Sequence, residues 1–198
     1  MRYSFLFLLL ITATAQSQQD NSKFKFNQDY IYLGGSFNRV TNLSTTSNSY
    51  EFGPGISLSV GHSWVSGSKW NFNWELEYFN MGELDLENTS SSEPYNVGTG
   101  ASALSISFKP VFRPSGSGFF IGGLAGFGKY TFEKNRLSLD ATHGHDVTES
   151  DYGMAMGGEL GYEFDRLILS AGYRSMSSTM FGQTVNMSSL SFGGRYKF

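Results

Sequence analysis

One dipeptide carries the side chains that could do covalent chemistry. His62 and Ser63 are adjacent, and a serine activated by a histidine is the start of a nucleophile–base pair. Neighbouring side chains of a strand point to opposite faces, however, and no third residue is placed to orient the histidine. We therefore expect no catalytic site here.

A second candidate is the polar stretch 143–151, which holds His143 and His145 together with several acids. Imidazole and carboxylate groups can bind metals. A His-x-His pair in a glycine-containing polar segment is more often solvated surface than a metal site. The chain also has no cysteine, which excludes thiolate ligands and disulfides. We expect neither a metal nor another cofactor.

A third group consists of acids and bases at every second position of alternating segments. The acids are Glu75, Glu77, Glu159 and Glu163, and the bases are Lys109, Arg174, Arg195 and Lys197. Buried charges persist only when they are paired and hydrogen-bonded. If these side chains share one interior, they predict a ladder of salt bridges, with Arg174 nearest Glu159 or Glu77.

The alternation itself indicates the β-strands that would position these charges. In 70–78, WNFNWELEY, large apolar residues alternate with Asn and Glu over about one membrane crossing of a tilted strand. Similar segments are 30–40, 56–61, 104–109, 119–132, 152–164, 167–174 and 185–198. Apolar faces toward lipid and polar faces toward a lumen predict an all-β fold, an eight-stranded antiparallel up-and-down transmembrane β-barrel.

Short and long connections alternate between the predicted strands. The segments 65–69, 113–118 and 165–166 are turn-like, whereas the longer polar segments are 41–50, 82–98, 133–151 and 176–184. Outer-membrane barrels have short periplasmic turns and longer external loops. We therefore expect four external loops, with both ends of the barrel at the periplasmic rim.

Aromatic residues gather near both ends of these strands, as in the interface girdles of membrane barrels. The six that we expect to form the girdles are Trp64, Trp70, Tyr78, Tyr152, Tyr162 and Tyr173. We also expect Tyr130 and Phe132 to belong to the outer girdle.

The first 15 residues have the pattern of an export signal. Arg2 precedes an apolar run at 5–11, and Ala13-Thr14-Ala15 matches a small-residue cleavage site. The run is too short for a membrane-spanning helix, which needs about 20 residues. We expect 1–15 to be a removed signal peptide, 16–29 a short periplasmic segment and 30–198 the transmembrane barrel domain.

The last strand supports a resemblance to a known family. Gly193 precedes hydrophobic residues at the third-last and last positions, Tyr196 and Phe198. Together with the export signal and the alternating strands, they make the chain resemble the small OmpA/OmpX-like outer-membrane barrels. The resemblance implies that these three residues are an assembly signal for the barrel-assembly machinery. We expect a monomer in the bacterial outer membrane, in contact with its lipids and lipopolysaccharide.

Several functions remain open for such a barrel. Eight strands enclose a lumen only wide enough for side chains, which favours a plugged structural cylinder presenting its loops. The alternatives are a small-solute channel, a surface adhesin and a lipid A-modifying enzyme. The formal net charge of −3 argues against nucleic acid as a partner, and the predicted external loops are acidic, unlike those of basic-looped adhesins.

Overall fold

The computed structural model describes residues 29–44, 49–50, 54–66, 69–88, 95–114, 118–138, 145–180 and 183–198. In these ranges there is no helix of the length and apolarity that a membrane crossing requires. The predicted signal peptide and all but the last residue of the segment 16–29 lie outside the described residues, so the division into these parts stays a prediction.

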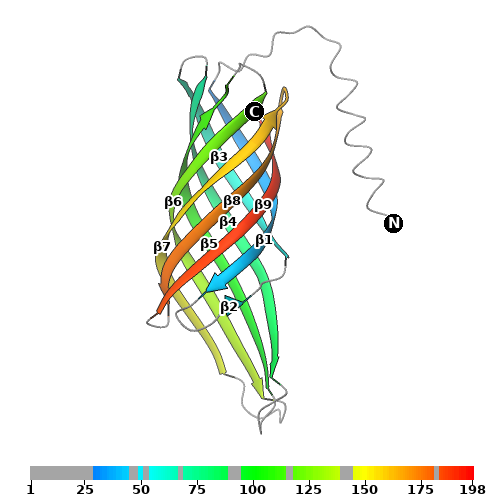
Figure 1. Cartoon of the computed structure of the whole chain (residues 1–198), viewed down its shortest axis with the longest axis vertical. Helices are drawn as coiled ribbons and strands as arrows, with labels where there is room; N and C mark the ends of the chain where they lie inside the picture. Colours follow the sequence, from blue (N-terminus) through cyan, green and yellow to red (C-terminus); the bar gives the residue numbers. More distant parts are fainter. Residues whose placement is uncertain are drawn as a thin grey trace, which may run out of the picture.

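The described chain is a set of antiparallel strands, paired in the order β1-β3-β4-β5-β6-β7-β8-β9. They are β1 (Tyr30–Ser44), β2 (Ser49–Tyr50), β3 (Pro54–Ser66), β4 (Trp70–Asn88), β5 (Tyr95–Phe112), β6 (Phe119–Ser138), β7 (His145–Glu163), β8 (Leu167–Met180) and β9 (Gln183–Lys197). The strand β2 pairs only with the end of β1, and β1 also pairs with β9. The sheet therefore closes on itself, and the predicted eight-stranded up-and-down barrel is confirmed (Figure 1).

Closure depends on the pairing of β1 with β9, which runs from Tyr32 opposite Lys197 to Ser44 opposite Asn186. Gly193 lies opposite Ser36, and a Cβ on this glycine would come within 2.5 Å of the Ser36 Cβ. Real Cβ atoms essentially never approach so closely, so a larger residue would push the two strands apart at the seam. A seam without an open edge is what a barrel in hydrocarbon requires.

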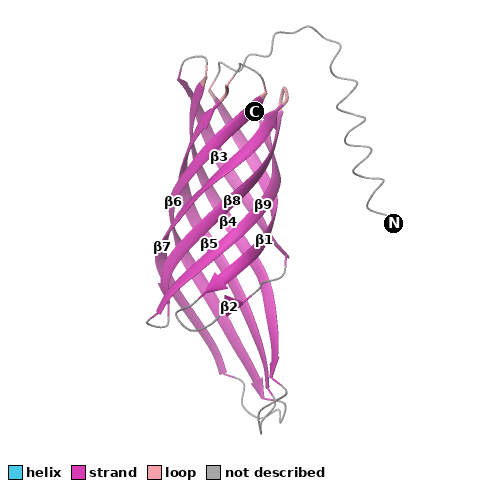
Figure 2. Cartoon of the chain, viewed as in Figure 1, coloured by secondary structure: helices cyan, strands magenta, loops and turns pink. Residues whose placement is uncertain are grey.

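The strands fall into two length classes. The strands β4 to β7 have 18–20 residues, whereas β1, β3, β8 and β9 have 13–15. The long strands continue as a four-stranded extension at the end away from the C-terminus (Figure 2). Its pairing reaches Asn88 opposite Tyr95 and Arg136 opposite His145.

The structure corrects all four predicted loops, two of them through this extension. In 41–50, residues 41–44 belong to β1 and 49–50 to β2. Much of 82–98 and 133–151 is strand, and in 176–184 only residues 181–182 lie outside the strands and outside the described residues. The prediction took a polar segment as a loop. A polar segment indicates only that its side chains no longer face lipid. The strands can continue beyond the lipid, because neighbouring strands still satisfy each other's N–H and C=O groups.

The wall of the barrel has an apolar outer face and a mixed inner face. Burial alternates residue by residue along β3, and large apolar side chains such as Leu58 and Met156 are more than 60% exposed on the outside. All six predicted girdle aromatics are exposed on this outer face: Trp64, Trp70, Tyr78, Tyr152, Tyr162 and Tyr173. Tyr130 and Phe132 are buried inside instead, so their assignment to the outer girdle was wrong; the glycines of β6 had obscured which face is which.

Candidate functional site: the filled lumen

The inner face changes from polar to apolar along the barrel axis. In β4 the inward residues begin with Asn71 and Asn73, continue with Glu75 and Glu77, and end with Phe79 and Met81, which are buried. We call the two resulting regions the ionic layer and the apolar layer. The ionic layer consists of Glu75, Glu77, Lys109, Arg113, Glu159, Glu163, Arg174, Arg195 and Lys197.

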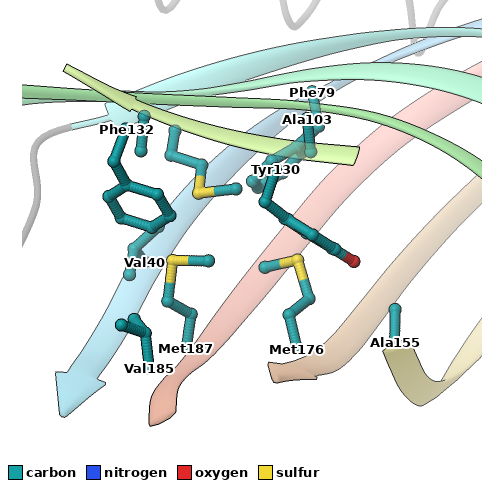
Figure 3. Close-up of a cluster of buried hydrophobic side chains, with 11 residues drawn as sticks. Val40, Phe79, Ala103, Tyr130, Phe132, Ala155, Met176, Val185 and Met187 are labelled. Atoms are coloured by element: carbon teal, nitrogen blue, oxygen red, sulfur yellow. The ribbon is translucent and has the colours of Figure 1, made fainter. Parts of the chain in front are cut away.

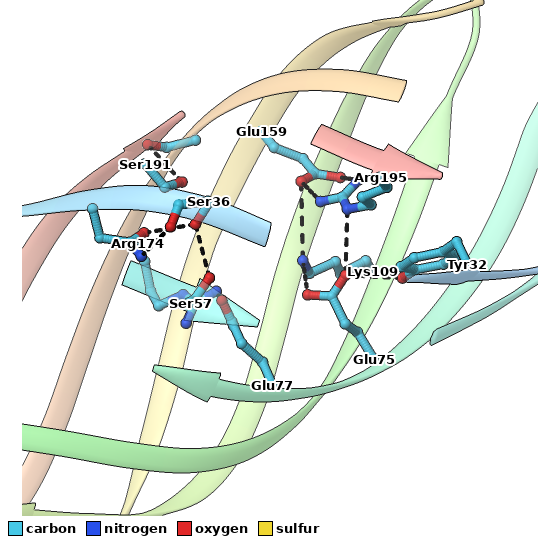
Figure 4. Close-up of polar contacts among 12 residues, drawn as sticks. Tyr32, Ser36, Ser57, Glu75, Glu77, Lys109, Glu159, Arg174, Ser191 and Arg195 are labelled. Carbon is cyan, nitrogen blue, oxygen red and sulfur yellow. Dashed lines mark hydrogen bonds and ion pairs between the residues drawn. The ribbon is translucent and has the colours of Figure 1, made fainter. Parts of the chain in front are cut away.

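Four charges form the centre of the ionic layer. Lys109 Nζ lies 2.5 Å from Glu75 Oε1 and 4.0 Å from Glu159 Oε2. The Arg195 guanidinium donates two hydrogen bonds to the Glu159 carboxylate, and its Nε lies 3.4 Å from Glu75 Oε2 (Figure 4). Each charge therefore faces two of opposite sign, which is the arrangement that makes buried ions tolerable. The four charges are contributed by four strands, so the quartet ties opposite parts of the wall together.

Tyr32 joins this quartet from β1 and was missed from the sequence. Its hydroxyl donates a hydrogen bond of 3.0 Å to Glu75 Oε2, and the Arg195 guanidinium lies 5.6 Å from the centre of its ring. The tyrosine is fully buried. It occupies an inward position of β1, and the adjacent glycines Gly34 and Gly35 had obscured which residues of this strand face inward.

A separate pair forms the edge of the ionic layer next to the apolar layer. Arg174 lies 2.5 Å from Glu77 Oε2, so the structure selects Glu77 from the two partners considered for this arginine. The Arg174 guanidinium also lies 5.5 Å from the centre of the Phe79 ring. Arg174 thus contacts both layers and marks the boundary between them.

The other edge of the ionic layer is a cluster around Glu163, close to the C-terminal end of the barrel. Arg113 donates to one oxygen of this carboxylate, and Lys197 Nζ lies 2.6 Å from the other. Arg113 also donates to Asn71 Oδ1 at 2.6 Å. The sequence prediction had assigned Arg113 to a turn; however, it shares the inward phase of Lys109 and Val111, and the structure places it in the lumen.

Side chains from seven strands fill the half of the lumen that lies away from the C-terminus (Figure 3). The apolar layer consists of Val40, Phe79, Met81, Ala101, Ala103, Tyr130, Phe132, Ala155, Met176, Val185 and Met187. Met176 lies in β8, where the prediction had placed the start of a loop, and Val185 and Met187 lie in β9, within the predicted strand 185–198. The layer was missed because Met176 was assigned to that loop and Tyr130 and Phe132 to the outer girdle, while the inward face of the other members was not recognised.

The ionic layer leaves a small cavity. It has a volume of about 40 Å³ and is lined by Ser36, Ser57, Ser59, Ser191, Glu77 and Arg174, among others. In its lining, the Ser36 and Ser57 hydroxyl oxygens of the paired strands β1 and β3 lie 2.8 Å apart. A polar space of this size holds a few water molecules, since one water needs about 10–15 Å³. It is too small for a solute path.

The structure brings the proposed catalytic and metal residues together nowhere in the described part of the chain. Ser63 is buried in the lumen and accepts a hydrogen bond from Asn71 Nδ2 at 3.0 Å, whereas His62 lies on the outer face beside Trp64. His143 and the side chain of His145 lie outside what the structure describes. Among the described residues no cluster of potential metal ligands occurs.

The three residues of the predicted assembly signal lie at the seam. Gly193 faces inward against β1, while Tyr196 and Phe198 are exposed on the outer face with their ring centres 5.2 Å apart. The Phe198 N–H donates to the Ile31 carbonyl oxygen at 2.9 Å, so backbone bonding continues to the last residue.

Comparison with solved structures finds several proteins with a similar architecture. The chain is similar to Neisserial surface protein A (TM-score 0.56, 16% identity, covering 85% of this chain and 97% of that one). It is also similar to Ail, the attachment invasion locus protein of Yersinia pestis (0.52, 18%, 86% and 97%). A third similar structure is the outer membrane protein OprG from Pseudomonas aeruginosa (0.51, 13%, 86% and 95%).

These likenesses are between folds. No protein-family model matches the chain, and no curated protein matches its sequence. The chain has the fold of the small eight-stranded outer-membrane barrels, which is the fold that the OmpA/OmpX-like resemblance predicted.

Proposed function

We propose that this protein is a structural component of a bacterial outer membrane: a sealed, monomeric barrel that presents its long hairpins outside the cell. The outer face supports insertion into lipid, because large apolar side chains cover it between two sets of exposed aromatic residues. The three similar structures support the same membrane, since Neisserial surface protein A, Ail and OprG share this fold.

The filled lumen is the observation that best supports a sealed barrel. A dissolved ion would have to displace paired charges in the ionic layer and then cross the apolar layer. The second step is costly because the residues of that layer offer an ion alkyl, thioether and aromatic groups and the single Tyr130 hydroxyl. At the same level the described lumen adds the hydroxyls of the buried Ser178 and Ser189, opposite Val185 and Val40, and neither carries a charge. The two layers together favour a plug over a small-solute channel.

Conductance of the purified protein in planar lipid bilayers tests this proposal. We expect no steady current steps under conditions in which an open porin from the same preparation conducts. A reproducible channel from properly folded protein, identified by its heat-modifiable migration on gels, would contradict the sealed state.

The other functions have separate tests. Deleting the tips of the β4–β5 and β6–β7 hairpins should leave host-cell attachment of the producing bacterium unchanged, and a loss of attachment would instead support the adhesin alternative. Overproduction should leave the acylation of lipid A unchanged in mass spectra. A change that disappears with Ser63→Ala would support the enzyme alternative.

Assembly by the barrel-assembly machinery is a further part of the proposal. It is supported by the seam, where Tyr196 and Phe198 lie at the outer surface of the last strand. Removing Phe198 should lower the amount of folded barrel in outer-membrane fractions, whereas Phe192→Leu in the same strand should not. Equal amounts for both variants would contradict a role of Phe198 in assembly.

A further inference from the structure

A polar groove lies on the outside of the wall, just beyond the apolar belt on the side of the long hairpins. Its volume is about 130 Å³, far above the roughly 15 Å³ that one water needs. Six of the residues that line it are Tyr78, Asn80, Gly100, Ser102, Thr131 and Glu133, from β4, β5 and β6. Gly82 and Ala101 complete the lining, and Ala101 is the one lining residue that also belongs to the apolar layer.

Strand register and a bulge produce the hollow. Asn80, Ser102 and Thr131 lie side by side across three strands. Immediately beyond Asn80 the register of β4 shifts, and Gly82 adopts a positive φ of 83°, a conformation that glycine tolerates best. The Gly82 N–H donates to Asn80 Oδ1 at 2.9 Å, which holds the amide side chain at the rim. Gly100 leaves the floor of the groove without a side chain.

The lining has the chemistry of a site for sugar hydroxyl groups. Asn80, Ser102 and Thr131 supply both donors and acceptors, and Glu133 supplies a carboxylate acceptor. The half-exposed Tyr78 adds an aromatic ring on which the C–H face of a sugar can pack. None of the groove's described lining residues is a lysine or an arginine, which disfavours a bare phosphate as the ligand.

The position of the groove indicates where such a sugar would come from. Tyr78 belongs to the outer aromatic girdle, and the row of residues on its membrane side continues with Leu104 and Lys129. The groove therefore opens at the level where the lipid tails end and the head groups begin. An exposed Lys129 in that row is suitably placed for a phosphate carried by the same lipid.

We propose that this groove binds a sugar of a membrane glycolipid head group, lying between Tyr78 and Glu133 with its lipid tails along the apolar belt. Binding requires no opening of the barrel and no movement of the ionic or apolar layers. The protein would then carry a specific lipid at one side of its wall, in addition to the general lipid shell around it.

Filling the groove is the direct test, and Gly100 is the position for it. A Cβ built on Gly100 meets nothing closer than 3.9 Å, so Gly100→Val should fold while occupying the hollow. The matched control is Ser177→Val, an exposed outward position on β8 that is also beyond the girdle but remote from the groove. Heat-modifiable migration on gels confirms that both variants are folded.

The probes are rough-type lipopolysaccharide, the same lipid after removal of its phosphates, its released core oligosaccharide, and phosphatidylglycerol. Binding to the detergent-solubilised full chain is measured by native mass spectrometry and calorimetry. We expect Gly100→Val to weaken lipopolysaccharide binding by about tenfold or more, since it creates a clash with the ligand, and Ser177→Val to leave it unchanged. The dephosphorylated lipid should bind almost as well, and the free oligosaccharide should bind more weakly but with the same sensitivity to Gly100→Val.

Other results would overturn the proposal. Equal binding by Gly100→Val and the unaltered chain would show that the groove is not the site. Loss of binding on dephosphorylation, or equal binding of phosphatidylglycerol, would identify a phosphate contact instead of a sugar site. A free oligosaccharide that binds as tightly as the whole lipid would show that the ligand is a soluble saccharide and not a glycolipid.

Discussion

The ionic and apolar layers fill the same cylinder, on the same strands, by different physical means. In the ionic layer each side chain is held by directional contacts to named partners, such as Lys109 to Glu75, and a cavity of about 40 Å³ remains. In the apolar layer the side chains need only shape and volume to fit. The first layer ties distant strands together, whereas the second excludes water and ions. We expect the two layers to fail in different ways when single residues are replaced.

The largest expected effect comes from breaking the central quartet. Arg195→Met leaves Glu159 and Glu75 with only Lys109 between them, and removing one partner of a buried ion pair costs about 3–5 kcal/mol. Denaturant unfolding of the barrel in lipid vesicles should show this loss of unfolding free energy. Arg166→Met, on an exposed turn, is the control and should change it by less than about 0.5 kcal/mol. A small effect of Arg195→Met would mean that the quartet is not a tie between strands.

A cavity in the apolar layer should cost less, and its cost should depend on volume alone. Met187→Ala is expected to lower the unfolding free energy by about 3 kcal/mol, because it removes buried groups that the packed layer cannot replace. Met187→Leu keeps the volume and should cost less than about 1.5 kcal/mol. Equal losses for both replacements would indicate that Met187 has a specific partner, and the distinction between the layers would be weakened.

The boundary between the layers offers a smaller and more specific test. Arg174→Lys keeps the charge beside Glu77 but loses the planar guanidinium over Phe79, a contact worth about 2 kcal/mol when it is shielded from water. Unfolding measurements on Arg174→Lys, on Phe79→Leu and on the double variant should reveal coupling between the two residues. Simple addition of the two single effects would show that the layers are independent.

The smallest predicted effect has the opposite sign. The Tyr130 hydroxyl is buried in the apolar layer and has no hydrogen-bond partner among the described atoms. Tyr130→Phe removes this unsatisfied group without changing the ring and should raise the unfolding free energy by about 1 kcal/mol. A loss of stability would show that the hydroxyl is bound, for example by a water molecule, and that the apolar layer is not dry.

The sequence was most informative where lipid and lumen impose alternation. Nine residues from Trp70 to Tyr78 are enough to predict a strand, its faces and the inward direction of Glu75 and Glu77. All eight predicted charges lie in the ionic layer. Their inward direction could be predicted because each belongs to a clearly alternating segment. Pairing partners were harder to predict, since they depend on register: Arg174 could face either of two glutamates until the strands were aligned.

The same reasoning failed where the two faces of a strand have the same polarity, or where a strand is as polar as a loop. Tyr130 and Phe132 are as apolar as the outer face, so an apolar lumen removes the difference between inside and outside. Met176 follows Ser175 and was assigned to a loop, because beyond the lipid both faces of a strand can be polar. For Arg113 the phase of Lys109 was available, but the nearby proline and glycines suggested a turn.

The four-stranded extension of β4 to β7 limits how deeply the barrel can be inserted in a bilayer. In the described pairing, residues 83–88 of β4 pair with β5 alone, and residues 145–151 of β7 pair with β6 alone. Their main-chain N–H and C=O groups along these two margins require water, and hydrocarbon supplies none. The bilayer must therefore end below both margins, so the unequal strand lengths fix the height of the protein in its membrane as firmly as the aromatic girdles do.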